Sequence, residues 1–228
     1  MTRGLRLLVI GKQGSGKGTL CTSFAQHFGI PHISTGDSLR FAAAQQTAVG
    51  LEAKSYMDTG KLVPDELVMR IVDELFVVQD LLNRGFLFDG FPRTIHQADL
   101  LDALLGPEGI DAVIYLEVDT DIVVERLSSR RVCINPECGA VYSLKSPPKV
   151  KWACDLCGSP VTQRDDDKVE AILQRFADYE MMTAPLISRY EKTGKLVTVD
   201  AKGTPDEVFT LALGQLVARA IAPGVSSK

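Results

Sequence analysis

The chain has 228 residues, of which 45% are hydrophobic and 24% are charged; this composition is typical of a soluble globular protein and excludes a collagen-like or disordered chain. Its 25 Lys and Arg residues stand against 29 Asp and Glu, a net charge of −4, so we expect neither nucleic acid nor a membrane surface as a partner. No apolar run approaches the roughly 20 residues of a membrane span. The short apolar run near the start does not resemble a secretion signal, and we therefore expect a cytoplasmic protein.

Apolar, β-branched runs alternate along the chain with longer segments of helical period, which is the pattern of a parallel sheet flanked by helices. The expected strands are residues 5–10, 32–33, 86–89, 112–117 and 195–199. The expected helices are residues 17–28, 65–82, 94–105, 121–130, 169–190 and 205–220. Two segments break this alternation and are predicted to be insertions, 34–63 and 129–167. The predicted core is then 1–33, 64–128 and 168–222, followed by a tail at 223–228.

A glycine-rich stretch lies between the first expected strand and the first expected helix. It reads Gly11-Lys12-Gln13-Gly14-Ser15-Gly16-Lys17-Gly18-Thr19, which has the spacing and the context of a phosphate-binding loop. Glycines let the backbone wrap around an oxyanion, backbone N–H groups and the helix N-terminus face it, and the lysine adds a positive charge. We therefore expect a polyphosphate ligand. Most such loops carry a Mg²⁺-binding Ser or Thr directly after the lysine, and this one has Gly18.

Three further motifs follow in order along the chain. They are Ser34-Thr35-Gly36-Asp37, Gly60-Lys61-Leu62-Val63-Pro64-Asp65, and Asp89-Gly90-Phe91-Pro92-Arg93-Thr94 with Gln97. Together with the loop pattern G-x-x-G-x-G-K-G-T, they resemble the adenylate kinases, members of the nucleoside monophosphate kinase group of P-loop NTPases. The resemblance runs from about residue 5 to residue 208.

This resemblance implies a P-loop NTPase core in which a parallel sheet is flanked by helices, an AMP-binding subdomain at 34–63 and a lid at 129–167. It implies reversible transfer of the terminal phosphoryl group of MgATP to AMP, giving two ADP, under a closing lid. It also implies a monomer whose ligands are ATP, AMP and ADP, with Mg²⁺ bound to the ATP.

The resemblance also implies roles for individual residues. The residues expected to contact AMP are Thr35, Arg40, Lys61, Leu62, Val63, Gly90, Phe91, Pro92, Arg93, Gln97, Arg164 and Arg175. Those expected to contact ATP are Gly14, Ser15, Gly16, Lys17, Gly18, Thr19, Arg126, Tyr142 and Gly203, although packing is an equal alternative for Tyr142. The expected catalytic residues are Lys17, Arg93, Arg130, Arg164 and Arg175. Asp37 and Asp89 are expected to hold Mg²⁺ through water.

The arginines fit this chemistry independently of the resemblance. Joining two nucleotides through their phosphates brings several negative charges together, and the planar guanidinium group binds phosphate oxygens at two points. Arg126 and Arg130 lie four residues apart in an expected helix, so they are predicted to project from one face. Any one of these arginines alone has the alternative of an ordinary solvated side chain.

Four cysteines lie within the second insertion as two pairs, Cys133-x4-Cys138 and Cys154-x2-Cys157. This spacing predicts a four-thiolate zinc site, and because such a site leaves no open position for water, the zinc is expected to be structural. Two disulfides or four free thiols are the alternatives. Cys21 lies apart from the cluster and is expected to be a small buried hydrophobic residue.

Two other functions remain open. A UMP/CMP kinase or a GTP-using AMP kinase would share most of these motifs. A non-catalytic nucleotide sensor or zinc-ribbon binding module could also retain a phosphate loop, although the acidic net charge argues against nucleic acid as its partner.

Overall fold

The computed structural model describes residues 3–221. The predicted tail at 223–228 lies outside the described residues. The core of the molecule is a five-stranded parallel sheet with the strand order β2-β3-β1-β4-β8. Its strands are β1 (Arg6–Gly11), β2 (His32–Ser34), β3 (Phe86–Asp89), β4 (Ala112–Glu117) and β8 (Leu196–Asp200). The predicted α/β class with a parallel sheet is therefore confirmed.

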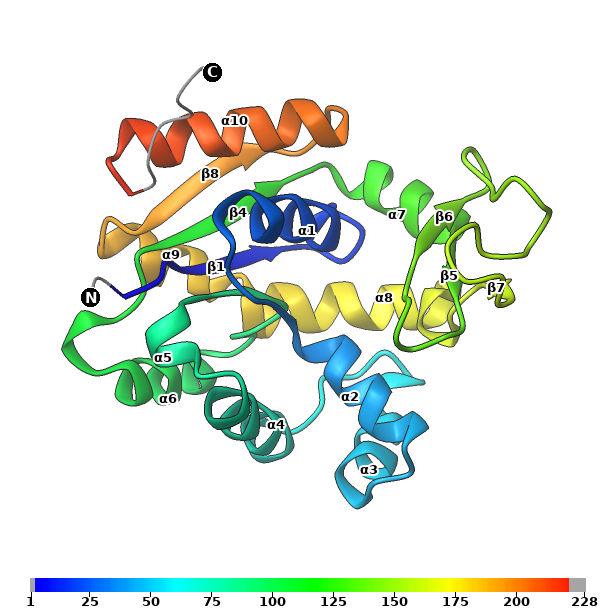
Figure 1. Cartoon of the computed structure of the whole chain (residues 1–228), viewed down its shortest axis with the longest axis horizontal. Helices are drawn as coiled ribbons and strands as arrows, with labels where there is room; N and C mark the ends of the chain where they lie inside the picture. The colour runs from blue at the N-terminus through cyan, green and yellow to red at the C-terminus, as the bar shows by residue number, and fades with distance from the viewer. Residues whose placement is uncertain (1–2, 222–228) are drawn as a thin grey trace.

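Successive residues of the central strand β1 point to opposite faces of the sheet and enter two separate apolar layers. Leu7 and Val9 pack with one set of helices, whereas Leu8 and Ile10 pack with the other. Because both faces are covered, all six residues of β1 are buried. The sheet is thus the middle layer of three (Figure 1).

Side chains of α1 (Lys17–Phe28), α7 (Thr120–Ser129) and α10 (Pro205–Ala218) contribute to the first layer. The second layer contains side chains of α4 (Asp65–Val78), α5 (Leu81–Arg84), α6 (Ile95–Leu105) and α9 (Pro185–Lys192). Short 3₁₀ turns occur at Gly106–Glu108 (η1) and Asp165–Asp167 (η2). No helix within residues 3–221 is long and apolar enough to cross a membrane.

Two expected helices are interrupted. The segment 65–82 divides into α4 and α5 because Asp80, with φ 51°, takes the left-handed conformation and ends the helical path. The segment 169–190 divides into α8 (Val169–Asp178), a π-helix η3 (Tyr179–Thr183) and α9. Within η3 the Ala184 N–H donates to the carbonyl of Tyr179, five residues back, and Pro185 has no N–H with which to continue the α-helical pattern.

Both predicted insertions lie outside the central sheet. In the first, α2 (Thr35–Ala44) packs on α3 (Ala48–Met57). The second contains a small antiparallel sheet in the order β6-β5-β7, made of β5 (Arg130–Cys133), β6 (Val141–Ser143) and β7 (Val161–Thr162). Figure 1 shows them as two separate projections at the same end of the molecule. The boundaries 34–63 and 129–167 remain predictions.

Candidate active site

The phosphate loop connects β1 to α1 and is shaped by its glycines. Gly14 (φ 80°) and Gly16 (φ 97°) have left-handed conformations that favour glycine. A Cβ atom at Gly14 would also lie only 2.9 Å from the Cγ of Leu127. The loop closes on itself, because the Ser15 N–H donates to the carbonyl of Lys12 over 3.1 Å. The sequence context predicted for this loop is therefore confirmed, with a strand before it and a helix after it.

Lys17, the first residue of α1, folds back over the loop. Its Nζ donates to the carbonyls of Gly11 and Lys12, both at 2.9 Å. Burial lowers the pKa of Lys17 to about 8; Asp89 opposes this effect, and the positive charges of Arg93 and Arg175 add to it. An anion that entered the loop would restore the stability of the ammonium form.

Asp89 ends β3 beside the first turn of α1. A Cβ atom at Gly18 would lie 3.4 Å from its Oδ2, so the carboxylate occupies the neighbourhood in which other phosphate loops place a Ser or Thr hydroxyl. This position suits an oxygen group that holds hydrated Mg²⁺. Asp37, the other residue expected to hold Mg²⁺, is instead paired with Arg40 at 2.5 Å and with Arg164 at 3.3 Å. Its pKa is lowered, because the two guanidinium groups outweigh the opposing effect of burial.

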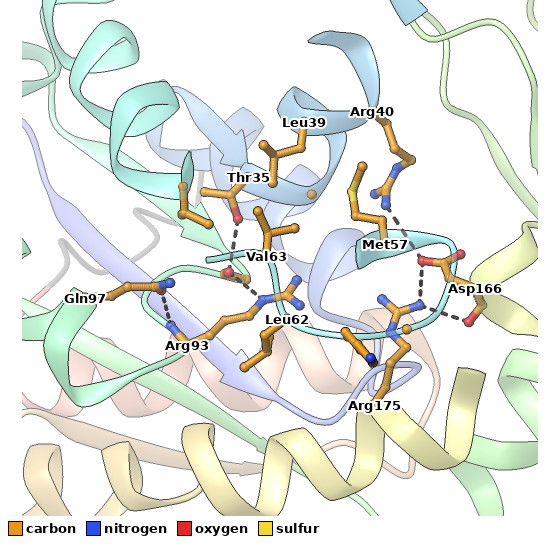
Figure 2. Close-up of a pocket in the computed structure, with 15 residues that line it drawn as sticks. Thr35, Leu39, Arg40, Met57, Leu62, Val63, Arg93, Gln97, Asp166 and Arg175 are labelled. Atoms are coloured by element: carbon orange, nitrogen blue, oxygen red, sulfur yellow. Dashed lines mark hydrogen bonds and ion pairs between the residues drawn. The ribbon is translucent and has the colours of Figure 1, made fainter. Parts of the chain in front are cut away.

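Two pockets adjoin in front of the phosphate loop, between the sheet and the first insertion. Figure 2 shows the first of them, with Thr35 and Leu39 on one side and Arg93 and Arg175 on the other. The residues expected to contact AMP that line this first pocket are Thr35, Arg40, Lys61, Leu62, Val63, Gly90, Arg93, Gln97 and Arg175. The second pocket includes Gln13, Lys17 and Pro92. Both pockets share Gly60, Leu62, Gly90, Arg93 and Arg175.

Gln97 is the most constrained polar side chain of the first pocket, with only 2% of its surface exposed. Its Oε1 accepts a hydrogen bond from the Arg93 N–H and its Nε2 donates to Asp65 Oδ1, both at 2.7 Å. Asp65 also accepts from the Thr94 hydroxyl at 2.9 Å, and Thr94 caps α6 by accepting from the Gln97 N–H. The amide is therefore held in one orientation, with one N–H and one lone pair left for a ligand.

Phe91 differs from the other residues expected to contact AMP. Its side chain is fully buried and packs on Phe88, with ring centroids 5.2 Å apart. Phe91 therefore belongs to the core beneath the pocket. The Phe91–Pro92 peptide bond is cis.

Aspartates hold most of the arginines around the pockets in place. Arg130 forms a two-point pair with Asp167 at 2.8 and 2.6 Å, and Arg175 pairs with Asp166 at 2.6 Å. Arg40 lies 3.9 Å from the same Asp166. Burial lowers the pKa of Arg175 to about 10; the charges of Arg93 and Arg130 add to this effect, and Asp166 opposes it.

Arg164 is held by Asp37. Its pKa is also lowered to about 10, first by burial and then by the charges of Arg40 and Arg130. The buried arginines of this region therefore repel one another and lack solvation, which destabilises the ligand-free protein, and a bound anion would offset that destabilisation.

The prediction that Arg126 and Arg130 share one helix face is wrong. Helix α7 ends at Ser129, and Arg130 has extended backbone angles (φ −63°, ψ 139°) that start β5. Arg126 points instead to the loop after β8, where its Nη2 donates to the carbonyl of Ala201 at 3.1 Å. Its Nη1 also lies 3.5 Å from the Ser15 carbonyl of the phosphate loop. In the loop after β8 its Nη2 lies 3.4 Å from the carbonyl of Lys202, the residue before Gly203.

The four cysteines of the second insertion come together as predicted, and all four Sγ atoms lie within 4.8 Å of one another. The Cys133–Cys157 and Cys138–Cys154 separations are 3.4 and 3.6 Å, far beyond the roughly 2.05 Å of a disulfide and near the spacing of four thiolates around one zinc ion. The donor set therefore fits zinc. Tyr142 belongs to this cluster, because its hydroxyl lies 3.4 Å from Cys154 Sγ and accepts from the Asp155 N–H at 2.8 Å.

Two contributors to the site were not among the residues expected to act there. Asp65, which the sequence analysis quoted only as the last residue of the Gly60–Asp65 motif, orients Gln97 from the start of α4. Thr183 lines the second pocket and its hydroxyl donates to the Arg93 carbonyl at 2.9 Å. It reaches Arg93 from the π-helix η3, which no periodicity in the sequence indicated.

A phosphate loop at the carboxyl end of a parallel sheet, an adjoining pocket with a fixed amide, and arginines at the junction define a P-loop nucleotide kinase. A family model described as adenylate kinase matches residues 9–195. An adenylate kinase of Carboxydothermus hydrogenoformans is 49% identical over 208 residues, covering 90% of this chain and 96% of that protein. Those of Caldanaerobacter subterraneus subsp. tengcongensis (47%, covering 90% and 93%) and Streptomyces avermitilis (44%, covering 93% and 97%) are also similar. The chain belongs to the adenylate kinase family, and its function is that of an adenylate kinase.

Proposed function

We propose that this chain transfers the terminal phosphoryl group of MgATP to AMP by reversible, in-line transfer, giving two ADP. The observation that carries this proposal is the junction of the two pockets at Arg93 and Arg175, beside Lys17. A phosphoryl group that passes between two nucleotides needs cationic groups at the point where both phosphate chains meet. The side chains bind and position the substrates, and no protein nucleophile is required.

The first pocket is proposed to hold AMP. Gln97 has one free amide N–H and one free lone pair, which match the N6 donor and the adjacent ring-nitrogen acceptor of adenine. The backbone at Lys61, Leu62 and Val63 would line the base, and Thr35 and the Gly90 carbonyl would form the wall opposite. The AMP phosphate would then lie against Arg40 and Arg93.

The phosphate loop is proposed to hold the phosphates of ATP through the backbone of residues 14–19 and the Lys17 ammonium. Arg126 and Gly203 would border the adenine of ATP, because Arg126 already bridges the loop after β8 and the phosphate loop. Mg²⁺ bound to ATP would neutralise part of the phosphate charge. Asp89 fits a role in holding its water shell. Asp37, held by two arginines, fits less well.

The arginines are proposed to exchange partners when substrates bind. Arg130 is paired with Asp167, Arg164 with Asp37, and Arg175 with Asp166. Phosphate oxygens of the bound substrates would take the place of these carboxylates or bind the same guanidinium groups beside them. The pair between Arg164 and Asp37 joins the second insertion to the first. Closure of the insertions at 34–63 and 129–167 would exclude water from the transferring group.

Zinc is proposed to be held by Cys133, Cys138, Cys154 and Cys157, and it would stabilise the small sheet of the lid. That sheet has few buried apolar residues of its own, and a closed four-thiolate site can supply the missing stability. We also propose a monomer, which is what the resemblance to the family implies.

The test is ADP production from MgATP with AMP, UMP, CMP or GMP as acceptor. Rapid turnover with AMP and at least about a hundredfold lower kcat/KM with the other acceptors is the expected result, because their bases do not match the Gln97 amide. UMP or CMP used as efficiently as AMP would refute the assignment of the first pocket. No turnover with any acceptor, in folded protein that contains zinc, would favour a nucleotide-binding module instead.

A further inference from the structure

Three potential metal-binding side chains lie together beneath the phosphate loop, away from the cysteine cluster of the lid. They are Cys21 of α1, His32 of β2 and Asp89 of β3, and one ligand atom of each lies within 4.8 Å of the others. Neither Cys21 nor His32 has a role in the phosphoryl transfer proposed above.

The fold brings these residues to one point for simple geometric reasons. Cys21 lies four residues after Lys17, on the same face of α1, and α1 packs over β2 and β3. Ser34 and Asp89 are partners in the parallel pairing of β2 with β3, and His32, two residues before Ser34, points to the same face of the sheet. Three elements therefore present one side chain each to the same space, in which Cys21 is fully buried and His32 and Asp89 are partly exposed.

One polar atom in this space, Nε2 of His32, has no protein partner within the described residues. This nitrogen is buried, and it lies 3.8 Å from Asp89 Oδ2, beyond hydrogen-bond distance. The Cys21 side chain is fully buried. A buried ring nitrogen usually has a partner, so this one indicates that a ligand belongs between the imidazole and the carboxylate.

We propose that Cys21, His32 and Asp89 bind a second divalent transition metal of the zinc class, separate from the zinc of the lid. A thiolate, an imidazole and a carboxylate form a donor set that prefers zinc-like ions to Mg²⁺. The two negative charges of the thiolate and the carboxylate balance a dication, and the thiol proton passes to solvent when the Cys21 sulfur binds. Three protein ligands leave a fourth position for water.

The distances require only a local contraction. Bond lengths of about 2.0 to 2.3 Å around a tetrahedral ion place its ligand atoms roughly 3.3 to 3.7 Å apart. The His32–Asp89 separation of 3.8 Å is already close to this range, whereas the widest separation in the group, up to 4.8 Å, must shorten by about an ångström.

Occupation of this site would inhibit the kinase. Asp89 is the carboxylate best placed to hold the water shell of Mg²⁺, and the bound ion would also add positive charge beside Lys17. The second metal and MgATP should therefore exclude each other. This inhibition rests on the proposed role of Asp89, whereas the metal site itself does not, and direct measurement of bound metal separates the two.

The experiment is a Co²⁺ titration of protein that already contains one zinc per chain in the lid. The wild type is expected to bind one further equivalent of Co²⁺ and to develop a near-ultraviolet thiolate-to-cobalt absorption band. Cys21→Ala is expected to lose the band, and His32→Gln is expected to weaken Co²⁺ binding about tenfold or more. His27→Gln is the matched control, because His27 is an exposed histidine on the same helix and should leave the titration unchanged.

The outcomes are distinct. A band that persists in both Cys21→Ala and Cys21→Ser comes from the lid and overturns the proposal, as does a wild type that binds no second equivalent. The near-ultraviolet circular dichroism of each variant shows that it is folded, and His32→Gln retains the cysteine should both Cys21 variants unfold. If MgATP fails to release the second ion, the site stands and its inhibitory role is refuted.

Discussion

Lys17→Met is expected to make the ligand-free protein more stable while it abolishes catalysis. Burial lowers the pKa of Lys17 from 10.5 to about 8, and this drop corresponds to about 3 kcal/mol of unfavourable free energy for the charged side chain at neutral pH. Methionine has a similar shape and no charge. It loses the hydrogen bonds to the Gly11 and Lys12 carbonyls, worth about 1 to 2 kcal/mol together. The net gain should be about 1 to 2 kcal/mol, or roughly 2 to 8 °C in Tm.

The difference in stability between Lys17→Met and the wild type should depend on pH. Between pH 8 and pH 10.5 the unfolded chain holds the Lys17 proton more tightly than the folded chain, so the stability of the wild type rises relative to that of the variant. The advantage of Lys17→Met should be complete below pH 8 and fade towards pH 10.5. Urea unfolding of the ligand-free proteins at several pH values measures it.

Turnover should move in the opposite direction, with kcat at least about a hundredfold lower in Lys17→Met because the ammonium contacts the phosphates. Lys12→Met is the matched control, because Lys12 belongs to the same loop and its Nζ contacts Thr120 and Glu180. This substitution should change the free energy of unfolding by about 0.5 kcal/mol or less and leave turnover intact. If Lys17→Met were less stable than the wild type at pH 7, or if the difference did not depend on pH, the electrostatic account would be refuted.

Three further changes test separate parts of the site. Gln97→Ala should raise the KM for AMP about tenfold with little change in kcat, because it removes binding common to the ground and transition states; steady-state kinetics with unchanged KM would contradict this. Asp89→Asn should lower kcat about a hundredfold and weaken the dependence of rate on Mg²⁺, and a wild-type Mg²⁺ titration curve would exclude the role given to Asp89. Tyr142→Phe should weaken zinc binding by the lid about tenfold in competition with a chromogenic chelator. A raised KM for ATP with unchanged zinc affinity would instead place Tyr142 at the nucleotide.

Several features of this protein follow from local sequence alone. The phosphate loop needs only a strand, closely spaced glycines, a lysine and a helix start, all of which are contiguous in residues 6–28. The paired cysteines likewise lie within one short segment, so their spacing restricts how they can meet. Strand segments that are apolar at successive positions predicted a sheet covered by helices on both faces, and the fully buried strand β1 confirms this.

Other features depended on where the helices end. Arg126 and Arg130 were expected on one helix face, but α7 ends between them. Arg126 therefore donates to the Ala201 carbonyl, whereas Arg130 pairs with Asp167. The π-helix η3, which carries Thr183 to Arg93, is similarly invisible in the pattern of apolar residues. Helix ends are set by the small free-energy differences of the last turn, and packing against the rest of the chain can outweigh local propensity there.

The sequence by itself determined which chemical groups are present and which short segments hold them: the phosphate loop, the cysteine pairs and the aspartate that ends a core strand. Only the tertiary structure decided which of those groups meet. The Gln97–Asp65 hydrogen bond, the Arg130–Asp167 pair and the convergence of Cys21, His32 and Asp89 all join residues from different elements. Such contacts arise because strand order and helix packing bring distant segments together, and neither is written in the local pattern of any one segment.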